Sequence, residues 1–442
     1  MSDRDDLDRL LQPPVEPLPP PPGAFDRVRR TARRRRWARA AMSAGAAALI
    51  VIAGVPGTLF VLQGRDGRIA DPPATERNAS SSAAASATAE AAPPVATTGG
   101  GAAPGRGPGG GPPGGPVPPG FAPESVTFVS SGLGWALGGA PCSDPPCTSV
   151  VRTEDGGRGW EGIPAPRTGG EDEPDGVSEL RFADPSNGWA YGPGLWSTHD
   201  GGATWHDVDV PGGGRVIEAA AAGGWAVAVV STCGKDPDCG SFRVYGTPAG
   251  ADRWRPLPGG RGTAGDGVAG VSLTVRGRNA YVAGGGPSGA AIWSGPMDGT
   301  GGWVRRAAPC RDGAYPAGIT SASDGEFVLV CAGRPGAGGQ PKIAYLSGDG
   351  GTSWRRGGDV PSGGLVTSVA ATPAKIFVAT NHGLLISGDG GRGWRRDLAG
   401  RGFDYVGFTT DQQGVLVPTG ADPGELLFSY DAGRTWSRER FR

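Results

Sequence analysis

Short apolar runs separated by turn residues recur along the C-terminal part of the chain. The runs come in pairs, for example 126–129 with 134–136, and 180–182 with 188–190. They are brief and alternate only weakly between apolar and polar positions, which is typical of strands that are buried on both faces. Third runs, such as 343–346, lead directly into a polar turn. This pattern predicts an all-β domain built from repeated antiparallel strands.

The polar turns share one motif, Ser/Thr-x-Asp-x-Gly-x-x-Trp, which occurs five times. Its aspartates and tryptophans are Asp155 and Trp160, Asp200 and Trp205, Asp349 and Trp354, Asp389 and Trp394, and Asp431 and Trp436. Two weaker copies end at Trp254 and Trp303, and the seven tryptophans are 45, 49, 49, 51, 40 and 42 residues apart. A four-stranded propeller blade requires a repeat of this length.

We therefore predict a seven-bladed β-propeller over residues 123–442, with six or eight blades as the alternatives. The domain begins with an innermost strand and ends just after an outermost one, so no strand remains to close the ring by exchange. The motif occupies the hairpin between the third and fourth strands. Its hydroxyl and carboxylate can accept hydrogen bonds from loop amides, and its tryptophan can cover the turn. We expect the five aspartates to be structural, neither catalytic nor metal-binding, and we predict no cofactor.

A Gly-Trp-Ala strand followed by Asp-Gly-Gly-x-x-Trp, as at 188–190 and 200–205, resembles the BNR/Asp-box repeat propellers. This WD40/YVTN/BNR-like group includes sialidases, sortilin-type receptors, some glycoside hydrolases and the photosystem II stability/assembly factor family. The last is the most similar, and the chain looks like an actinobacterial, membrane-anchored form. The resemblance covers residues 123–442 and implies the fold rather than the function. The Arg-Ile-Pro motif of sialidases is missing, and a role in photosystem II is not carried over.

The first 122 residues divide into three predicted segments. Residues 1–39 are acidic, then proline-rich, and end in an arginine cluster, which predicts a disordered cytoplasmic tail. Residues 40–63 carry no charge and are long enough for a single transmembrane helix. Residues 64–122 consist mainly of Ala, Ser, Thr, Gly and Pro, which predicts a disordered, flexible linker.

The arginine cluster lies before the apolar segment, and few charges follow it. The positive-inside rule then predicts a single-pass protein of the cell membrane, with the N-terminus inside and the C-terminal domain extracytoplasmic. A cleaved signal peptide and a core helix of a soluble domain are the alternatives for residues 40–63.

Composition agrees with a chain that is folded only in part. The 83 Gly and 43 Pro among 442 residues would suit disorder, but 13 Trp and a charged fraction of 19% indicate a folded region. The formal net charge of −1 shows no excess of basic residues of the kind that binds nucleic acid, so we expect no nucleic-acid partner.

Six cysteines lie in the predicted propeller and nowhere else. An even number outside the membrane predicts disulfides, for which fifteen pairings are possible. Nearness in the sequence favours Cys142 with Cys147, Cys233 with Cys239, and Cys310 with Cys331. A zinc site is the alternative, although the usual two-residue spacing is missing and no histidine is near.

The strand order places the cysteine loops on the face opposite the motif turns. An acidic insertion at 169–176 and a loop predicted at 256–270 share the cysteine face, and long loops of this kind often carry function. The candidate contact residues are Asp144, Glu171, Asp172, Glu173, Asp175, Lys235, Asp236, Asp238, Arg261, Asp266, Arg311 and Asp312. For each of them, an ordinary solvated charge is the alternative.

The function that we expect is a non-enzymatic binding or assembly module, displayed on a stalk, for an unknown extracytoplasmic protein or cell-wall glycan. No acid–base or nucleophile set is recognisable in the sequence. One alternative is a wall-associated glycoside hydrolase or lyase that uses loop carboxylates. A second is a transmembrane sensor with a docking peptide at 7–11 in its tail.

Overall fold

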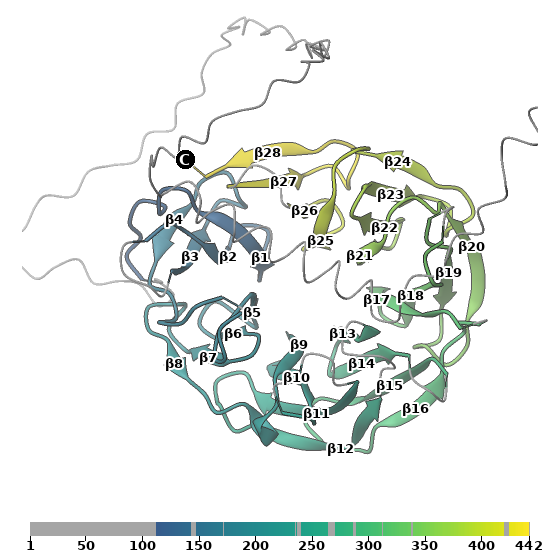
Figure 1. Cartoon of the computed structure of the whole chain (residues 1–442), viewed down its shortest axis with the longest axis horizontal. Coiled ribbons are helices and arrows are strands. Elements are labelled where there is room, and N and C mark those ends of the chain that lie inside the picture. The colour runs from purple at the N-terminus through teal and green to yellow at the C-terminus, as the bar shows by residue number, and fades with distance from the viewer. Residues whose placement is uncertain are drawn as a thin grey trace, which may run out of the picture. The chain divides into compact units, whose positions relative to one another are not determined.

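The computed structural model describes residues 112–142, 147–170, 172–234, 236, 240–263, 270–285, 289–311, 313–336, 339–419 and 424–441. Within these residues, 28 strands form seven antiparallel sheets of four consecutive strands each. Figure 1 shows the sheets as blades around a central axis. The seven-bladed propeller predicted from the tryptophan repeat is confirmed.

The first three blades span the N-terminal half of the ring. Blade 1 contains β1 (Ala122–Phe128), β2 (Gly134–Gly139), β3 (Thr148–Thr153) and β4 (Glu161–Ile163). Blade 2 contains β5 (Glu179–Phe182), β6 (Gly188–Tyr191), β7 (Leu195–Thr198) and β8 (His206–Asp207). A 3-10 turn, η1 (Pro211–Gly213), precedes blade 3, which contains β9 (Val216–Ala222), β10 (Trp225–Ser231), β11 (Ser241–Pro248) and β12 (Arg255–Thr263).

Four further blades complete the ring. Blade 4 contains β13 (Ser272–Arg276), β14 (Asn279–Gly284), β15 (Ala291–Pro296) and β16 (Val304–Ala307). Blade 5 contains β17 (Tyr315–Ser323), β18 (Glu326–Ala332), β19 (Lys342–Ser347) and β20 (Arg355–Val360). Blade 6 contains β21 (Val366–Thr372), β22 (Lys375–Thr380), β23 (Gly383–Ser387) and β24 (Arg395–Asp397). Blade 7 contains β25 (Phe403–Phe408), β26 (Gly414–Pro418), β27 (Glu425–Ser429) and β28 (Ser437–Arg440).

The hydrophobic core lies between neighbouring blades. The Gly-Trp-Ala strands contribute large side chains to it: Trp135 of β2 is 1% exposed and stacks on Phe182 of blade 2, with ring centroids 3.7 Å apart. The Trp135 indole N–H also donates to the Gly201 carbonyl of blade 2 at 3.2 Å. Both faces of a blade are covered in this way, so its strands carry apolar side chains on both sides. This explains why apolar and polar residues alternate only weakly along each strand.

The ring closes by side-chain packing between blades 7 and 1. Phe121, Val126 and Val151 on the blade 1 side share one buried cluster with Phe428 and Phe441 of the last blade. The rings of Phe121 and Phe441 meet edge to face with centroids 5.1 Å apart. Each sheet contains only its own four strands, so the prediction that no strand is exchanged holds for the described residues.

Antiparallel pairing gives the propeller two different faces. In each blade, the hairpin between the first and second strands lies on the same side of the ring as the hairpin between the third and fourth strands. We call this side the turn face. The loops between second and third strands, and the connections between blades, lie on the opposite side, which we call the loop face.

Two boundaries differ from the sequence-based prediction. Packing begins before residue 123, because Gly115 pairs with Gly162 beside β4 and Phe121 is completely buried. The first part of the loop predicted at 256–270 is strand, since β12 extends to Thr263, and residues 264–269 lie outside the described residues. Pro256 and Pro258 suggested a loop, but β12 is an outermost strand, where a residue without a backbone N–H costs no ladder bond on its free side.

The predicted tail, transmembrane helix and nearly all of the predicted linker lie outside the described residues. Among the described residues, no helix is long and apolar enough to cross a membrane.

Candidate functional site

Disulfides brace the loop face at two positions. Cys142 and Cys147 close the loop between β2 and β3, with sulfurs 1.99 Å and Cα atoms 5.7 Å apart. Cys310, in the connection from blade 4 to blade 5, is bonded to Cys331 near the end of β18. These two predicted pairs are confirmed. Cys233 is also disulfide-bonded, and Cys239 lies outside the described residues.

The acidic insertion of blade 2 is a hydrogen-bonded loop on the same face. The Val177 N–H donates to the Gly169 carbonyl at 3.0 Å, and the Gly176 N–H donates to the Glu173 carbonyl at 3.1 Å. Thr168, which is 8% exposed, donates its hydroxyl to the Asp175 carbonyl at 2.8 Å. The backbone at the base of the loop is thus held in one conformation.

The insertion presents its carboxylates outward and is tied to the first disulfide loop. Asp172, Glu173 and Asp175 are all exposed. The Thr148 hydroxyl, one residue after Cys147, donates to the Thr168 carbonyl at 2.5 Å. We call residues 168–176, together with the Cys142–Cys147 loop, the acidic brace.

Three other described candidates lie outside the acidic brace. Asp236 is exposed in blade 3, and Arg311 is exposed in the connection between blades 4 and 5. Arg261 belongs to β12 and not to a loop. The other candidates lie outside the described residues; they are Asp144, Glu171, Lys235, Asp238, Asp266 and Asp312.

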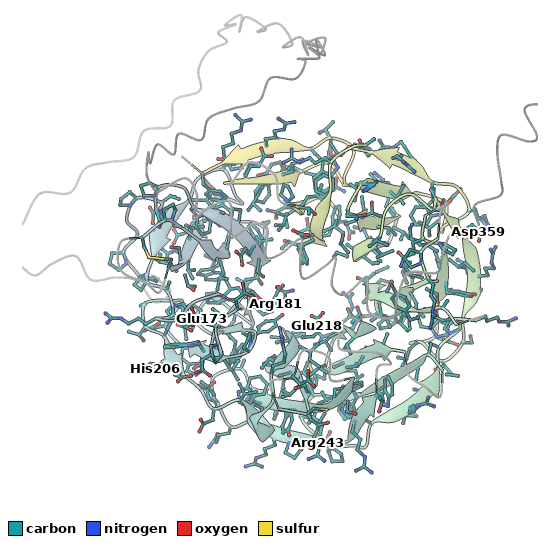
Figure 2. All side chains as sticks on the ribbon, viewed as in Figure 1. Glu173, Arg181, His206, Glu218, Arg243 and Asp359 are labelled. Atoms are coloured by element: carbon teal, nitrogen blue, oxygen red, sulfur yellow. A yellow bond between two sulfur atoms is a disulfide. The ribbon has the colours of Figure 1, made fainter. Side chains whose placement is uncertain are left out.

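A charged cluster that the sequence analysis missed lies near the axis. Figure 2 shows Arg181 of β5 and Glu218 of β9 toward the centre of the ring. Arg181 donates to the Ser125 hydroxyl at 3.3 Å and lies 3.9 Å from a Glu179 carboxylate oxygen. Burial disfavours the Arg181 charge, but nearby tyrosines and carboxylates outweigh burial and raise its pKa. The guanidinium therefore stays charged and links the innermost strands of blades 1 and 2.

The Ser/Thr and Asp side chains of the motif make the same hydrogen bonds to their turn in every strong copy. In blade 6, the Ser387 hydroxyl donates to Asp389 Oδ1 at 2.9 Å and accepts the Gly391 N–H at 2.8 Å. Asp389 Oδ1 also accepts the N–H of Gly393 at 2.9 Å. The Trp394 indole N–H then donates to the Gly391 carbonyl at 3.0 Å. The hydroxyl and the carboxylate are thus used by their own turn, whereas the tryptophan varies, since the Trp205 indole N–H donates to the Pro164 carbonyl after β4 at 3.0 Å.

These bonds favour the ionised form of the motif aspartates. Hydrogen bonds from Ser353 and Ser347 lower the pKa of Asp349 to about 2. Burial of Asp431 acts to raise its pKa, but hydrogen bonds from Thr435 and Ser429 outweigh burial and lower it to about 2. The pKa values of Asp155, Asp200 and Asp389 are lowered as well.

We predict that the propeller loses stability in acid between about pH 4 and pH 2. The folded pKa lies below the unfolded value of 3.8, so the stabilisation is complete above the unfolded pKa and is lost as pH falls through the folded one. Thermal unfolding midpoints from pH 7 to pH 2 measure the effect. Asp431→Asn should lower the midpoint at pH 7 and make its fall in acid shallower, and an unchanged slope would contradict the assignment.

The turn face carries a pocket that none of the candidate contact residues lines. It has a volume of about 500 Å³ and lies between the motif turns of blades 6 and 7. Three basic side chains, Lys375, Arg395 and Arg434, line it together with Trp394. Asp389, Gly388, Gly393 and Ile386 complete its wall.

Charge is distributed unevenly around the ring. Residues 112–263, which contain blades 1–3, include 18 acidic and 10 basic residues. Residues 270–441, which contain blades 4–7, include 14 acidic and 17 basic residues. The acidic brace therefore lies in the acidic part of the ring, and the basic pocket lies in the basic part.

Comparison with known proteins identifies relatives in fold. No protein-family model matches the chain, and no curated protein sequence matches it. A structure described as YCF48 bound to D1 peptide has 20% sequence identity and a TM-score of 0.47, with 71% of this chain and 95% of that chain covered. YCF48 from Cyanidioschyzon merolae has 18% identity and a TM-score of 0.49, with 73% and 99% covered.

An enzyme appears among the similar structures too. A GH74 enzyme from Niastella koreensis has 12% identity and a TM-score of 0.32, with 72% of this chain and 62% of that chain covered. The sheet topology of the chain itself establishes the seven-bladed β-propeller, and YCF48 is among the structures similar to it.

Proposed function

We propose that this chain is a non-enzymatic binding module that holds an extracytoplasmic protein partner with the acidic brace. In this proposal, residues 40–63 anchor the chain in the cell membrane with the N-terminus inside, and residues 64–111 act as the stalk. The absence of charge over residues 40–63 and the arginines that precede them support the anchor.

The single observation that carries the proposal is the hydrogen-bonded base of the acidic brace, as formed by its described residues. Its base is held by the Thr168 and Val177 hydrogen bonds, while Asp172 and Glu173 remain exposed. A loop that is ordered before binding loses little conformational freedom when a partner docks. Exposed carboxylates in an acidic part of the ring favour a partner with a basic surface, and they speed its association.

The arrangement of carboxylates favours binding over hydrolysis. A glycoside hydrolase requires two carboxyl groups on either side of a bound sugar. Asp172, Glu173 and Asp175 are solvent-exposed on one loop, and the carboxylate in the pocket, Asp389, is held by its own motif turn. The sensor alternative concerns the tail and remains a prediction.

Site-specific photo-crosslinking in intact cells tests the proposal. A benzophenone side chain at Glu173 should give a covalent protein adduct, whereas the same group at Thr352 on the turn face should not. Asp172→Lys and Asp175→Lys together should reduce the adduct at least about tenfold, because the partner then meets like charge. The effect of Asp172→Lys alone on the thermal midpoint should be small, since this side chain is exposed. Equal adducts from Glu173 and Thr352, or an adduct that survives charge reversal, would refute the proposed face.

A further inference from the structure

The pocket on the turn face has the size and lining of a small-ligand site. Its volume of about 500 Å³ lies within the range of known ligand pockets, which is about 300–1,000 Å³. It combines an indole with a few polar groups, and such combinations fix both the affinity and the orientation of a ligand. Because it lies on the turn face, it is separate from the acidic brace.

Three positive charges meet at this pocket. Lys375 donates to the Ala432 carbonyl at 2.7 Å, which uses one of its three ammonium protons. Arg395 contacts Asp397 at 2.9 Å, and the Arg434 side chain makes no hydrogen bond or ion pair with another described residue. Burial lowers the pKa of Lys375, and the charges of Arg434 and Arg395 lower it further, against the opposite effect of Asp431. An anion between these groups would relieve their mutual repulsion.

A glycine keeps the pocket open at the motif turn of blade 6. In blades 2, 5 and 7, the fourth residue after the motif aspartate carries a hydroxyl that donates to the aspartate Oδ2. The donors are Thr204 at 2.6 Å, Ser353 at 2.6 Å and Thr435 at 2.7 Å. Blade 6 has Gly393 at this position, so Asp389 Oδ2 receives no such hydroxyl. A Cβ atom at residue 393 would stand 2.9 Å from that oxygen.

The pocket therefore offers three kinds of contact to one ligand. The cations attract an anionic group, Asp389 Oδ2 can accept a hydroxyl hydrogen, and Trp394 provides a flat apolar surface. A phosphate ion has no apolar surface to place against Trp394, and an acidic peptide side chain brings a carboxylate without neighbouring hydroxyls. A sugar ring that bears a carboxylate supplies all three. We propose that the pocket between blades 6 and 7 binds an acidic sugar unit, a uronate, of a polysaccharide.

Calorimetric titration of the full chain with tri-galacturonate tests this site. Tri-galacturonate with free carboxylates should bind saturably, and its methyl ester should bind at least about tenfold more weakly. Equimolar inorganic phosphate should not displace the bound tri-galacturonate. Lys375→Met and Arg434→Met should each weaken binding about tenfold, because each removes a charge-assisted hydrogen bond. Asp172→Lys on the other face should leave the affinity unchanged, which separates this site from the proposed function.

Gly393→Ser provides the sharpest variant, with Gly159→Ser as its matched control. Both substitutions introduce the hydroxyl that blades 2, 5 and 7 already carry, but only residue 393 lines the pocket. Gly393→Ser should weaken tri-galacturonate binding at least about tenfold without lowering the thermal midpoint, and Gly159→Ser should change the affinity less than twofold. No binding by the wild-type chain, full binding by the Gly393→Ser protein, or equal affinity for phosphate would each overturn the assignment.

Discussion

Replacing Phe428 with alanine is expected to lower the free energy of unfolding by about 3–5 kcal/mol. Phe428 lies in β27, is 1% exposed, and belongs to the cluster that joins the last blade to the first. Its ring centroid is 6.0 Å from that of Phe128 and 6.4 Å from that of Trp160, both in blade 1. Truncation removes buried apolar area and leaves a cavity that a closed ring cannot collapse to fill.

Urea unfolding and hydrogen exchange measure this effect. Exchange should rise first in β1, β2, β26 and β27, because these strands flank the weakened junction. Val304→Ala serves as the control, since this valine is 48% exposed and its loss should cost less than about 0.5 kcal/mol. A loss below about 1 kcal/mol for Phe428→Ala would mean that blades 7 and 1 are not packed together as described.

Replacing Cys310 and Cys331 together with alanine should lower the free energy of unfolding by about 3 kcal/mol. The bond joins residues 21 apart and restricts the unfolded chain, and the entropy of loop closure for that length has about this value. Alanine is preferred to serine because Cys331 is 2% exposed, and a buried hydroxyl would add its own desolvation cost.

The matched control is the same double replacement at Cys142 and Cys147. These cysteines are 5 residues apart, so the same relation gives about 2 kcal/mol. Chemical denaturation of the two double variants beside the oxidised wild-type protein provides the comparison. A larger loss at the shorter loop would contradict the loop-length explanation and would indicate that the bond mainly supports the acidic brace in the folded state.

The fold could be predicted from the sequence because the residues that repeat along the chain are ones that each blade needs for its own turn. A serine such as Ser387 and an aspartate such as Asp389 bond to their own turn, so they recur in each strong copy whatever their neighbours are. Spacing then gives the number of blades, and strand order gives the two faces. The length of β12 could not be read in this way, because prolines suit both loops and outermost strands.

The pocket could not be predicted because its residues come from separate turns. Lys375, Gly393 and Arg434 are far apart along the chain, and each resembles an ordinary turn residue. One signal was present, since Gly393 replaces the Ser or Thr found at the same motif position in three other copies. Arg181 was missed for a related reason, because strand alternation does not distinguish a side chain near the axis from one between blades.

The way in which the ring closes also bears on how such a chain can change through evolution. Phe121 and Phe441 touch each other, and within the part of the chain that the structure describes no sheet takes a strand from another. A circular permutation that joins these ends and opens the chain between two other blades would preserve all seven sheets. For the same reason, duplication or loss of one repeat in the gene adds or removes a complete four-stranded sheet, and every other sheet keeps its four strands.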